Sequence, residues 1–179
     1  MARLIKSYKS HLTTRNNFFY SLTRSIVSQQ ISVAAADSVF SKFEKKCKGK
    51  INPKVVNKLS ITTLRKCGLS RLKAKGIKSL AKKILKKTFD PKLIKKMDDE
   101  EAILYLSGLR QIGRWSSEMV LIFFYNRQNI WPIQDIGLLR AISLNYKKKI
   151  LTSQKLCQKT SKKIFTLLYF SGYGIVALR

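Results

Sequence analysis

The chain has 179 residues, of which 45% are hydrophobic, enough to bury the core of one domain or of two small lobes and to exclude global disorder. No apolar run approaches the roughly 18 residues of a membrane span, and residues 1–15 lack the apolar stretch of a signal peptide. The 37 lysines and arginines against 9 acidic residues give a net charge of +28, which attracts polyanions and most often indicates nucleic acid. Codon usage in an AT-rich genome is an alternative source of part of the lysine excess.

The predicted elements are helices separated by short turns, with no convincing strand, which indicates an all-α fold. Most predicted starts carry a capping residue, in places followed by proline at the first helical position. In chain order, helices are expected to begin after Asn16 or Asn17, after Ser32, at Pro53, after Ser60, after Ser70, at Pro91, within the acidic cluster Asp98–Glu101, near Arg114, near Asp135 and near Thr152.

Helical spacing also predicts which apolar side chains face the core. We expect Val33 to share an inward face with Phe40 on the helix that follows Ser32. On the helix that follows Ser70, we expect Leu72 and Leu85 to point inward at its two ends.

Metal-ligating residues are few and scattered. Cys47, Cys67 and Cys157 form no Cys-x-x-Cys pair, and His11 is the single histidine. Structural zinc and iron–sulfur sites need clusters of such ligands. We therefore expect free, buried thiols and no metal bound by side chains.

Acidic residues are distributed unevenly along the chain. None occurs from Lys45 to Phe89, and none follows Asp135. A lone carboxylate in so basic a segment is either a helix cap or a functional group, and its position alone leaves both alternatives open.

The segment Leu106–Phe124 has the pattern of a helix, a tight turn and a second helix that begins near Arg114. The first N–H groups of a helix lack intrahelical partners and can hold a phosphate, with the helix dipole and the Arg114 side chain adding positive charge. Such a hairpin can grip a DNA backbone without reading its sequence, although helix hairpins are also common core architecture.

Four stretches together resemble the helix-hairpin-helix DNA glycosylases, in particular the branch that removes alkylated bases (3-methyladenine glycosylase type II). They are Ser25–Ser32, Cys67–Ala74, Leu109–Ser117 and Trp131–Leu138, and they occur in the family's order. The resemblance implies an all-α, two-lobed fold with the active site in the cleft between the lobes. Residues 17–130 are expected to form the central lobe with the hairpin, and residues 1–16 and 131–179 the second lobe.

Three side chains are candidates for the chemistry, two through the resemblance and one through its helical spacing. Asp135 matches the family's catalytic aspartate, which stabilises the oxocarbenium-like transition state and orients or deprotonates water. Trp115 matches a base-pocket aromatic on which a flipped cationic base stacks, and Met119, one helical turn later, lines the same pocket. The alternatives are a helix cap for Asp135 and core packing for Trp115 and Met119.

Further residues match positions that contact DNA. Gln30 matches the residue that fills the gap left by the flipped base, with a helix cap or an interhelical hydrogen bond as the alternative. Within the hairpin, DNA contacts are expected from Arg110, Gln111, Gly113, Arg114 and Ser116. The backbone carbonyl groups that match a monovalent-cation site in the family belong to Ser107, Leu109 and Ile112.

Two positions depart from the family pattern. The hairpin has Gln111 where the family has its first glycine, whose freedom to adopt positive φ allows close approach to a phosphate. A glutamine there is expected to strain or reshape the turn at a cost of about 1 kcal/mol. The consequence is either a weakened affinity for DNA or compensation by a new phosphate contact from Arg110. The tail around Gly172 resembles the family's tail but lacks its proline.

The resemblance implies a monofunctional DNA glycosylase of base excision repair that hydrolyses the N-glycosidic bond of alkylated purines and leaves an abasic site. A lyase of the same superfamily has a Schiff-base lysine at the position of Trp115. The alternatives are a DNA-binding protein of the same fold with impaired or lost catalysis, and a glycosylase for another lesion. We expect no cofactor, double-stranded DNA with damaged bases as the partner, no membrane association, a monomer, and a cytoplasmic, nucleoid-associated location.

Overall fold

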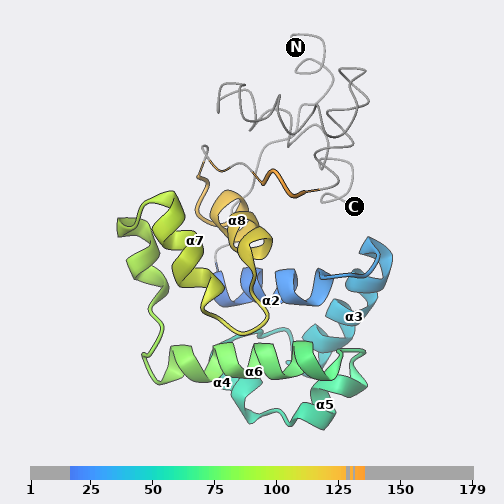
Figure 1. The fold of residues 1–179 in the computed structure, drawn as a ribbon. Helices are drawn as coiled ribbons and strands as arrows, with labels where there is room; N and C mark the ends of the chain where they lie inside the picture. Colours follow the sequence, from blue (N-terminus) through green and yellow to red (C-terminus); the bar gives the residue numbers. More distant parts are fainter. Residues whose placement is uncertain (1–16, 128–129, 131, 136–179) are drawn as a thin grey trace, which may run out of the picture. The chain divides into compact units, whose positions relative to one another are not determined.

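The computed structural model describes residues 17–127, 130 and 132–135, and regular secondary structure within these residues is entirely helical (Figure 1). The all-α prediction is therefore confirmed. The chain divides into two compact units, residues 15–120 and residues 1–14 together with 121–179. The lobe boundaries at 17 and 130 stay a prediction, and the helices expected after Asp135 and near Thr152 lie outside the described residues.

The described helices occupy most of the larger unit (Figure 1). In chain order they are α2 (Phe18–Ser28), α3 (Val33–Lys46), α4 (Pro53–Lys58), α5 (Ile61–Lys66), α6 (Arg71–Leu85), the 3-10 helix η1 (Pro91–Lys96), α7 (Asp99–Ser107) and α8 (Arg114–Phe123).

Short polar side chains set the starts of these helices. In five helices the capping oxygen accepts a hydrogen bond from the backbone N–H three residues later, which replaces a missing intrahelical acceptor. The five capping residues are Asn17, Ser32, Asn52, Ser60 and Ser70. At α7, Asp98 and Glu101 form a reciprocal capping box. The predicted starts at these positions are confirmed.

The Asp90–Pro91 signal begins a 3-10 helix and not an α-helix. The Asp90 side chain accepts from the N–H of Lys92, only two residues on, and its carbonyl accepts from Leu93, three residues on. This tight winding is typical of short connecting segments. Here the segment brings Phe89 against Tyr105 of α7, with ring centroids 4.8 Å apart.

Helix α6 is the centre of the larger unit. It contacts α2, α4 and α5, and Figure 1 shows it lying between α2 on one side and α4 and α5 on the other. Its residues Ala74, Ile77 and Ala81 are fully buried. Because α6 supports α2 directly, it can also position the polar residues at the end of α2.

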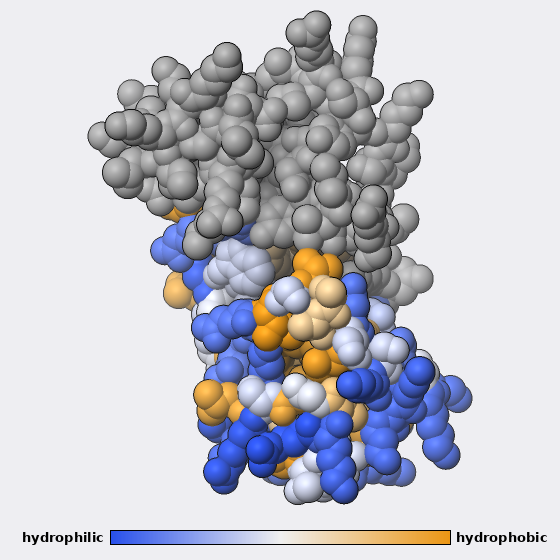
Figure 2. Space-filling model, turned by 90° about the vertical axis from the view of Figure 1, so that its right-hand side faces the viewer, coloured by the Kyte–Doolittle hydropathy of each residue, from blue (hydrophilic) through white to orange (hydrophobic). Residues whose placement is uncertain are grey.

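Three predictions of inward-facing residues are wrong. Val33 is 44% exposed, Leu72 57% and Leu85 39%. Each lies in the first or last turn of its helix, and periodicity predicts the direction of a side chain but not how far the neighbouring helices extend along the axis. Figure 2 shows one face of the described part, on which apolar side chains gather in the middle and hydrophilic side chains flank them.

Cys47 and Cys67 are free and buried, as predicted, and burial raises the pKa of the Cys47 thiol to about 11. Within the described ranges, no three His, Cys, Asp or Glu side chains gather as a metal site would require. None of the helices in these ranges has the length and apolarity needed to cross a membrane.

Candidate nucleic-acid interface

The turn after α2 carries the first predicted DNA contact. Gln29 caps the helix end, and Gln30 follows at φ 56°, in the left-handed region that favours glycine. The Gln30 side chain is exposed and makes no hydrogen bond to another described residue. The structure therefore gives Gln30 no interhelical hydrogen bond within this part of the chain, and its role as a wedge stays a prediction.

The neighbouring Gln29 connects α2 to the hairpin. Its Nε2 donates to the Gln111 carbonyl oxygen at 2.7 Å and to the Ser116 hydroxyl oxygen at 3.1 Å. One side chain thus contacts both the turn of the hairpin and the first turn of α8. Ser116 is only 3% exposed, and its hydroxyl oxygen already accepts from Gln29. The predicted contact of this hydroxyl with a phosphate therefore involves a buried group.

Lys73 of α6 holds the same turn from the other side. Its Nζ donates to the carbonyl oxygens of Val27 at 2.9 Å and Gln29 at 2.7 Å. Burial lowers the pKa of the Lys73 ammonium, because desolvation disfavours its charged form. Its two acceptors lie at the C-terminal end of α2, where the helix dipole favours a positive charge. Lys73 and Gln29 together fix the backbone from which Gln30 projects.

The hairpin keeps a left-handed turn although its first glycine is replaced. Gln111 has φ 68°, so the chain adopts the conformation that the family's glycine allows. The prediction of strain is consistent with this value, whereas the turn is not reshaped out of the left-handed region. The hydrogen bond from Gln29 to the Gln111 carbonyl compensates part of the cost.

Gly76 of α6 lets the hairpin approach closely. A Cβ atom at Gly76 would lie 2.8 Å from Gln111 Cγ and 3.2 Å from the Arg110 carbonyl oxygen. The aliphatic part of Gln111 therefore packs directly over this glycine. At Gly113, by contrast, a Cβ atom would meet nothing within 4 Å among the described residues, so these residues leave that side of the hairpin open.

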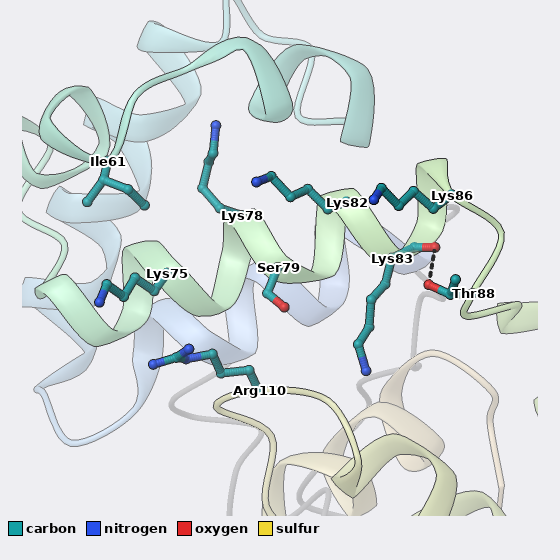
Figure 3. A pocket seen from close by; sticks show the side chains of 9 residues that line it. All are labelled: Ile61, Lys75, Lys78, Ser79, Lys82, Lys83, Lys86, Thr88 and Arg110. Atoms are coloured by element: carbon teal, nitrogen blue, oxygen red, sulfur yellow. Dashed lines mark hydrogen bonds between the residues drawn. The ribbon is translucent and has the colours of Figure 1, made fainter.

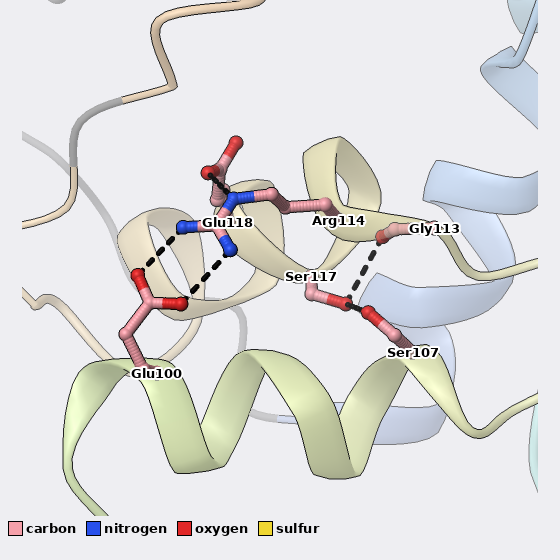
Figure 4. A network of polar contacts seen from close by, with 6 residues as sticks. All are labelled: Glu100, Ser107, Gly113, Arg114, Ser117 and Glu118. Atoms are coloured by element: carbon pink, nitrogen blue, oxygen red, sulfur yellow. Dashed lines mark hydrogen bonds and ion pairs between the residues drawn. The ribbon is translucent and has the colours of Figure 1, made fainter.

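Hydrogen bonds inside the hairpin tie its two arms together. The hydroxyl oxygens of Ser107 and Ser117 lie 3.2 Å apart, and the Ser117 hydroxyl donates to the Gly113 carbonyl at 3.0 Å (Figure 4). The Leu109 carbonyl accepts from the Ile112 N–H at 3.1 Å. A monovalent cation bound to the carbonyls of Ser107, Leu109 and Ile112 would therefore share the Leu109 oxygen with the Ile112 N–H. The cation site stays a prediction.

The Arg114 side chain is bound to two carboxylates. Its guanidinium donates to both oxygens of Glu100 at 2.8 Å and 2.6 Å and to Glu118 at 3.1 Å (Figure 4). The hydrogen bond from Arg114 lowers the pKa of the Glu100 carboxyl, and Glu100 in turn raises the pKa of Arg114. A phosphate contact by this guanidinium would therefore require exchange with the exposed Glu100. Arg110 is exposed and forms no ion pair among the described residues.

The residues predicted to carry the chemistry differ in exposure. Trp115 is partly buried on the first turn of α8, and Met119, four residues later on the same helix, is 7% exposed. Asp135 belongs to the other compact unit and is 3% exposed. Its backbone N–H bonds to the Pro132 carbonyl at 2.9 Å, which closes a turn.

The family model described as "HhH-GPD superfamily base excision DNA repair protein" matches residues 23–166 of this chain. The chain belongs to this superfamily. Among curated relatives, the alkylbase DNA glycosidase-like protein mag2 of Schizosaccharomyces pombe is 36% identical over 121 residues, which cover 65% of this chain and 57% of mag2. DNA-3-methyladenine glycosylase 1 of the same yeast is 28% identical over 142 residues, 77% of this chain and 62% of that protein. The chain thus spans about three fifths of the length of these relatives.

Solved structures show the same fold. The S. pombe 3-methyladenine DNA glycosylase Mag1 in complex with abasic DNA has a TM-score of 0.78 at 24% identity, covering 94% of this chain and 89% of that chain. The Archaeoglobus fulgidus 3-methyladenine DNA glycosylase has a TM-score of 0.74 at 25% identity, and the match covers 96% of this chain and 66% of the Archaeoglobus chain. The resemblance deduced from four short stretches is therefore confirmed at the level of family and fold. In this HhH-GPD chain, α7, residues 108–113 and α8 form the helix-hairpin-helix.

The structure brings some predicted residues together and adds others. Gln111 and Ser116 are joined through Gln29, next to the exposed Gln30. Three supporting residues were missed as functional candidates, namely Gln29, Lys73 and Gly76. All three had a signal in the sequence: Gln29 and Lys73 lie within two of the four stretches, and a glycine inside a helix is costly enough to indicate close packing. Gln29 differed from Gln30 in nothing that the sequence displays.

Proposed function

We propose that this chain is a monofunctional DNA glycosylase that removes alkylated purines from double-stranded DNA and leaves an abasic site. The observation that carries the proposal is the HhH-GPD match across residues 23–166, which includes the hairpin, Trp115 and Asp135. The names of the relatives, an alkylbase glycosidase-like protein and two 3-methyladenine glycosylases, support the alkylated-purine class. We further propose that the enzyme acts as a monomer.

Asp135 is the proposed catalytic carboxylate. Cleavage of an N-glycosidic bond builds positive charge on the deoxyribose, and a fixed negative charge stabilises that transition state. Asp135 is 3% exposed, and a carboxylate shielded from water acts through a lower effective dielectric than one at the surface. The same group can orient or deprotonate the attacking water. An alkylated purine is already cationic and leaves without strong acid catalysis, so one carboxylate is sufficient.

Trp115 and Met119 are proposed to receive the flipped base. An indole face attracts a cationic ring, and a partly buried tryptophan can present such a face. Met119 lies one helical turn away and supplies an adaptable apolar contact. Because Trp115 has no amino group, the chain has no Schiff-base nucleophile at this position, which supports hydrolysis without strand cleavage.

The hairpin is proposed to hold the DNA backbone. Its open side at Gly113 leads into the start of α8, where backbone N–H groups and the helix dipole favour a phosphate. Gln30 projects from the turn held by Lys73 and Gln29, which supports its role in filling the gap left by the flipped base. The chemistry needs no cofactor.

A base-release assay tests this proposal. Methylated duplex DNA is incubated with the wild-type protein and with Asp135→Asn, and freed 3-methyladenine and 7-methylguanine are measured. Asp90→Asn is the matched control, because it also removes one carboxylate while asparagine caps η1 equally well. We expect Asp135→Asn to lower the rate by about 10²–10³-fold with duplex affinity retained, and Asp90→Asn to be unchanged.

Two outcomes would contradict the proposal. Near-normal turnover by a folded Asp135→Asn protein would remove this residue from the catalytic role. Tight duplex binding by the wild-type protein without release of any methylated base would favour a DNA-binding protein of the same fold or a glycosylase for another lesion. A panel of oxidised and deaminated bases would then separate those two alternatives.

A further inference from the structure

An open groove with a strongly positive lining runs along α6 beside the hairpin. Two rows of side chains at helical spacing form its floor, Lys75, Ser79 and Lys83 in one row and Lys78, Lys82 and Lys86 in the other. Ile61 at the start of α5 lines one side, and Arg110 of the hairpin lines the other (Figure 3). Its volume of about 370 Å³ is in the range of small-molecule pockets, but those enclose most of their ligand, whereas this groove is open to solvent. Five lysines and an arginine indicate an anionic ligand instead.

The positive charges in the groove are not balanced by the protein. The sequence contains no acidic residue from Lys45 to Phe89, a range that includes all of α6. Within the part of the chain that the structure describes, Lys75, Lys82, Lys83, Lys86 and Arg110 form no ion pair. Lysine enrichment by codon usage adds basic residues anywhere on the surface, but it does not gather them around one groove without a single carboxylate.

Lys78 differs from the other lysines of the groove. Its Nζ donates to the carbonyl oxygens of Asn57 at 2.8 Å and Leu59 at 2.5 Å, at the end of α4. Burial and the nearby charge of Lys82 lower the pKa of the Lys78 ammonium. Lys78 therefore holds α4 against α6, whereas the remaining cations are available to a ligand.

The position of the groove favours DNA as the ligand. Arg110 belongs both to the groove and to the hairpin, and Gly76 of α6 contacts Gln111 directly. From Lys75 to Lys86 the lysines extend over twelve residues of helix and its cap, and the eleven steps between them span about 16 Å at 1.5 Å per residue. At 3.4 Å per base pair this length corresponds to about five base pairs of duplex.

We propose that the α6 groove binds the phosphodiester backbone of the duplex flanking the segment gripped by the hairpin, and so lengthens the DNA footprint by about five base pairs. The inference rests on the proposed function, because it takes DNA as the substrate. It adds a second phosphate-binding surface that depends on lysines of α6 and not on the helix-hairpin-helix. Contacts of this kind position the duplex and contribute affinity without reading sequence.

The test compares two triple variants on short and long duplexes. Lys82→Gln, Lys83→Gln and Lys86→Gln together remove three charges from the groove and leave Lys78 and Arg110 in place. The matched control is Lys42→Gln, Lys45→Gln and Lys46→Gln, which removes three charges from α3, also at a helix C-terminus. Binding of undamaged DNA duplexes of about 12 and 24 base pairs, lengths chosen to bracket the extended footprint, and of RNA duplexes of the same lengths is measured by fluorescence anisotropy over a range of salt concentrations.

We expect the groove variant to lose binding mainly on the long duplex. Each lost phosphate contact lowers the salt exponent by about 0.9, so three lysines lower it by about 2 to 3. When salt rises from 50 to 200 mM, the affinity of the groove variant should therefore fall by a factor that is roughly 15 to 60 times smaller than the factor for the wild-type protein. The α3 control should retain both the wild-type exponent and the gain from the longer duplex.

Three results would contradict the proposal that the α6 groove binds DNA. The first is an equal loss in the two triple variants, which would mean that the lysines act only through net charge. The second is a wild-type affinity for the long duplex that exceeds the affinity for the short duplex only by the factor expected from its larger number of binding positions. The third is a loss confined to duplex RNA, which would assign the groove to RNA. Because undamaged DNA is used, length-dependent binding without base release in the separate assay would contradict the proposed function alone.

Discussion

Replacing Gly76 by alanine tests how α6 supports the hairpin. The new methyl carbon would lie 2.8 Å from Gln111 Cγ, 3.0 Å from Gln111 Cβ and 3.2 Å from the Arg110 carbonyl oxygen. Overpacking of this kind costs about 1–3 kcal/mol, while the better helix propensity of alanine returns about 1 kcal/mol. We therefore expect Gly76→Ala to destabilise the protein by up to about 2 kcal/mol and to displace the hairpin.

A second substitution separates this contact from other effects of alanine in α6. Gln111→Gly removes both side-chain atoms that the new methyl group would meet, and it leaves only the Arg110 oxygen at 3.2 Å. Glycine also adopts the φ of 68° at this position without strain. In the Gln111→Gly background, Gly76→Ala should cost almost nothing, so the coupling energy between the two sites should be about 1–2 kcal/mol.

Thermal unfolding followed by circular dichroism measures these effects, since 1 kcal/mol shifts the Tm of a chain this size by about 2–4 °C. Gly108→Ala is the control, because its new methyl group would make only ordinary contacts, 3.5 Å from the Tyr105 oxygen. Duplex binding measured in parallel should weaken for Gly76→Ala and recover in the double variant. Additive costs in the double variant, or an equal cost at Gly108, would refute the reasoning.

Two further substitutions address the turn after α2 and the Arg114 cluster. Gln29→Ala removes the donor to Gln111 and Ser116, so Tm should fall by several degrees at about 1 kcal/mol per hydrogen bond and duplex binding should weaken; Gln30→Ala should leave Tm unchanged, and equal Tm values for the two variants would show that the bridge is unimportant. Glu100→Gln removes one carboxylate from Arg114, so duplex affinity at low salt should rise several-fold. That gain should disappear in an Arg114→Ala background, and its persistence there would exclude a phosphate contact by Arg114.

Helix starts could be predicted from the sequence because their determinants are local. Asn17, Ser32 and Ser70 each cap the helix that follows through a bond to a residue three positions away, and such spacing is visible in one dimension. Side-chain burial at helix ends depends on where neighbouring helices stop. Leu72 therefore has the periodicity of a core residue and is nevertheless 57% exposed.

The candidate site shows the same division. Gln30, Gln111 and Asp135 could be selected from short patterns that resemble a family, without knowledge of their surroundings. The bridge from Gln29 to Gln111 joins residues 82 positions apart, and no local pattern indicates which of two adjacent glutamines turns inward. Likewise, the sequence shows Arg114 as a basic residue at a helix start, but its bond to Glu100 depends on the packing of α7 against α8.

The replacement of the hairpin glycine by Gln111 predicts weakened DNA binding or a compensating contact from Arg110, and the structure shows how the turn accommodates it. Left-handed φ values at Gln30 and Gln111 each cost about 1 kcal/mol. Gln29 donates to the Gln111 carbonyl, Lys73 donates to the Gln29 carbonyl next to Gln30, and Gly76 leaves room for the Gln111 side chain. A hairpin supported in this way can keep the shape that a phosphate requires. With that shape kept, the substitution gives no support to a DNA-binding protein with impaired or lost catalysis, and the decision between such a protein and an enzyme depends on Asp135.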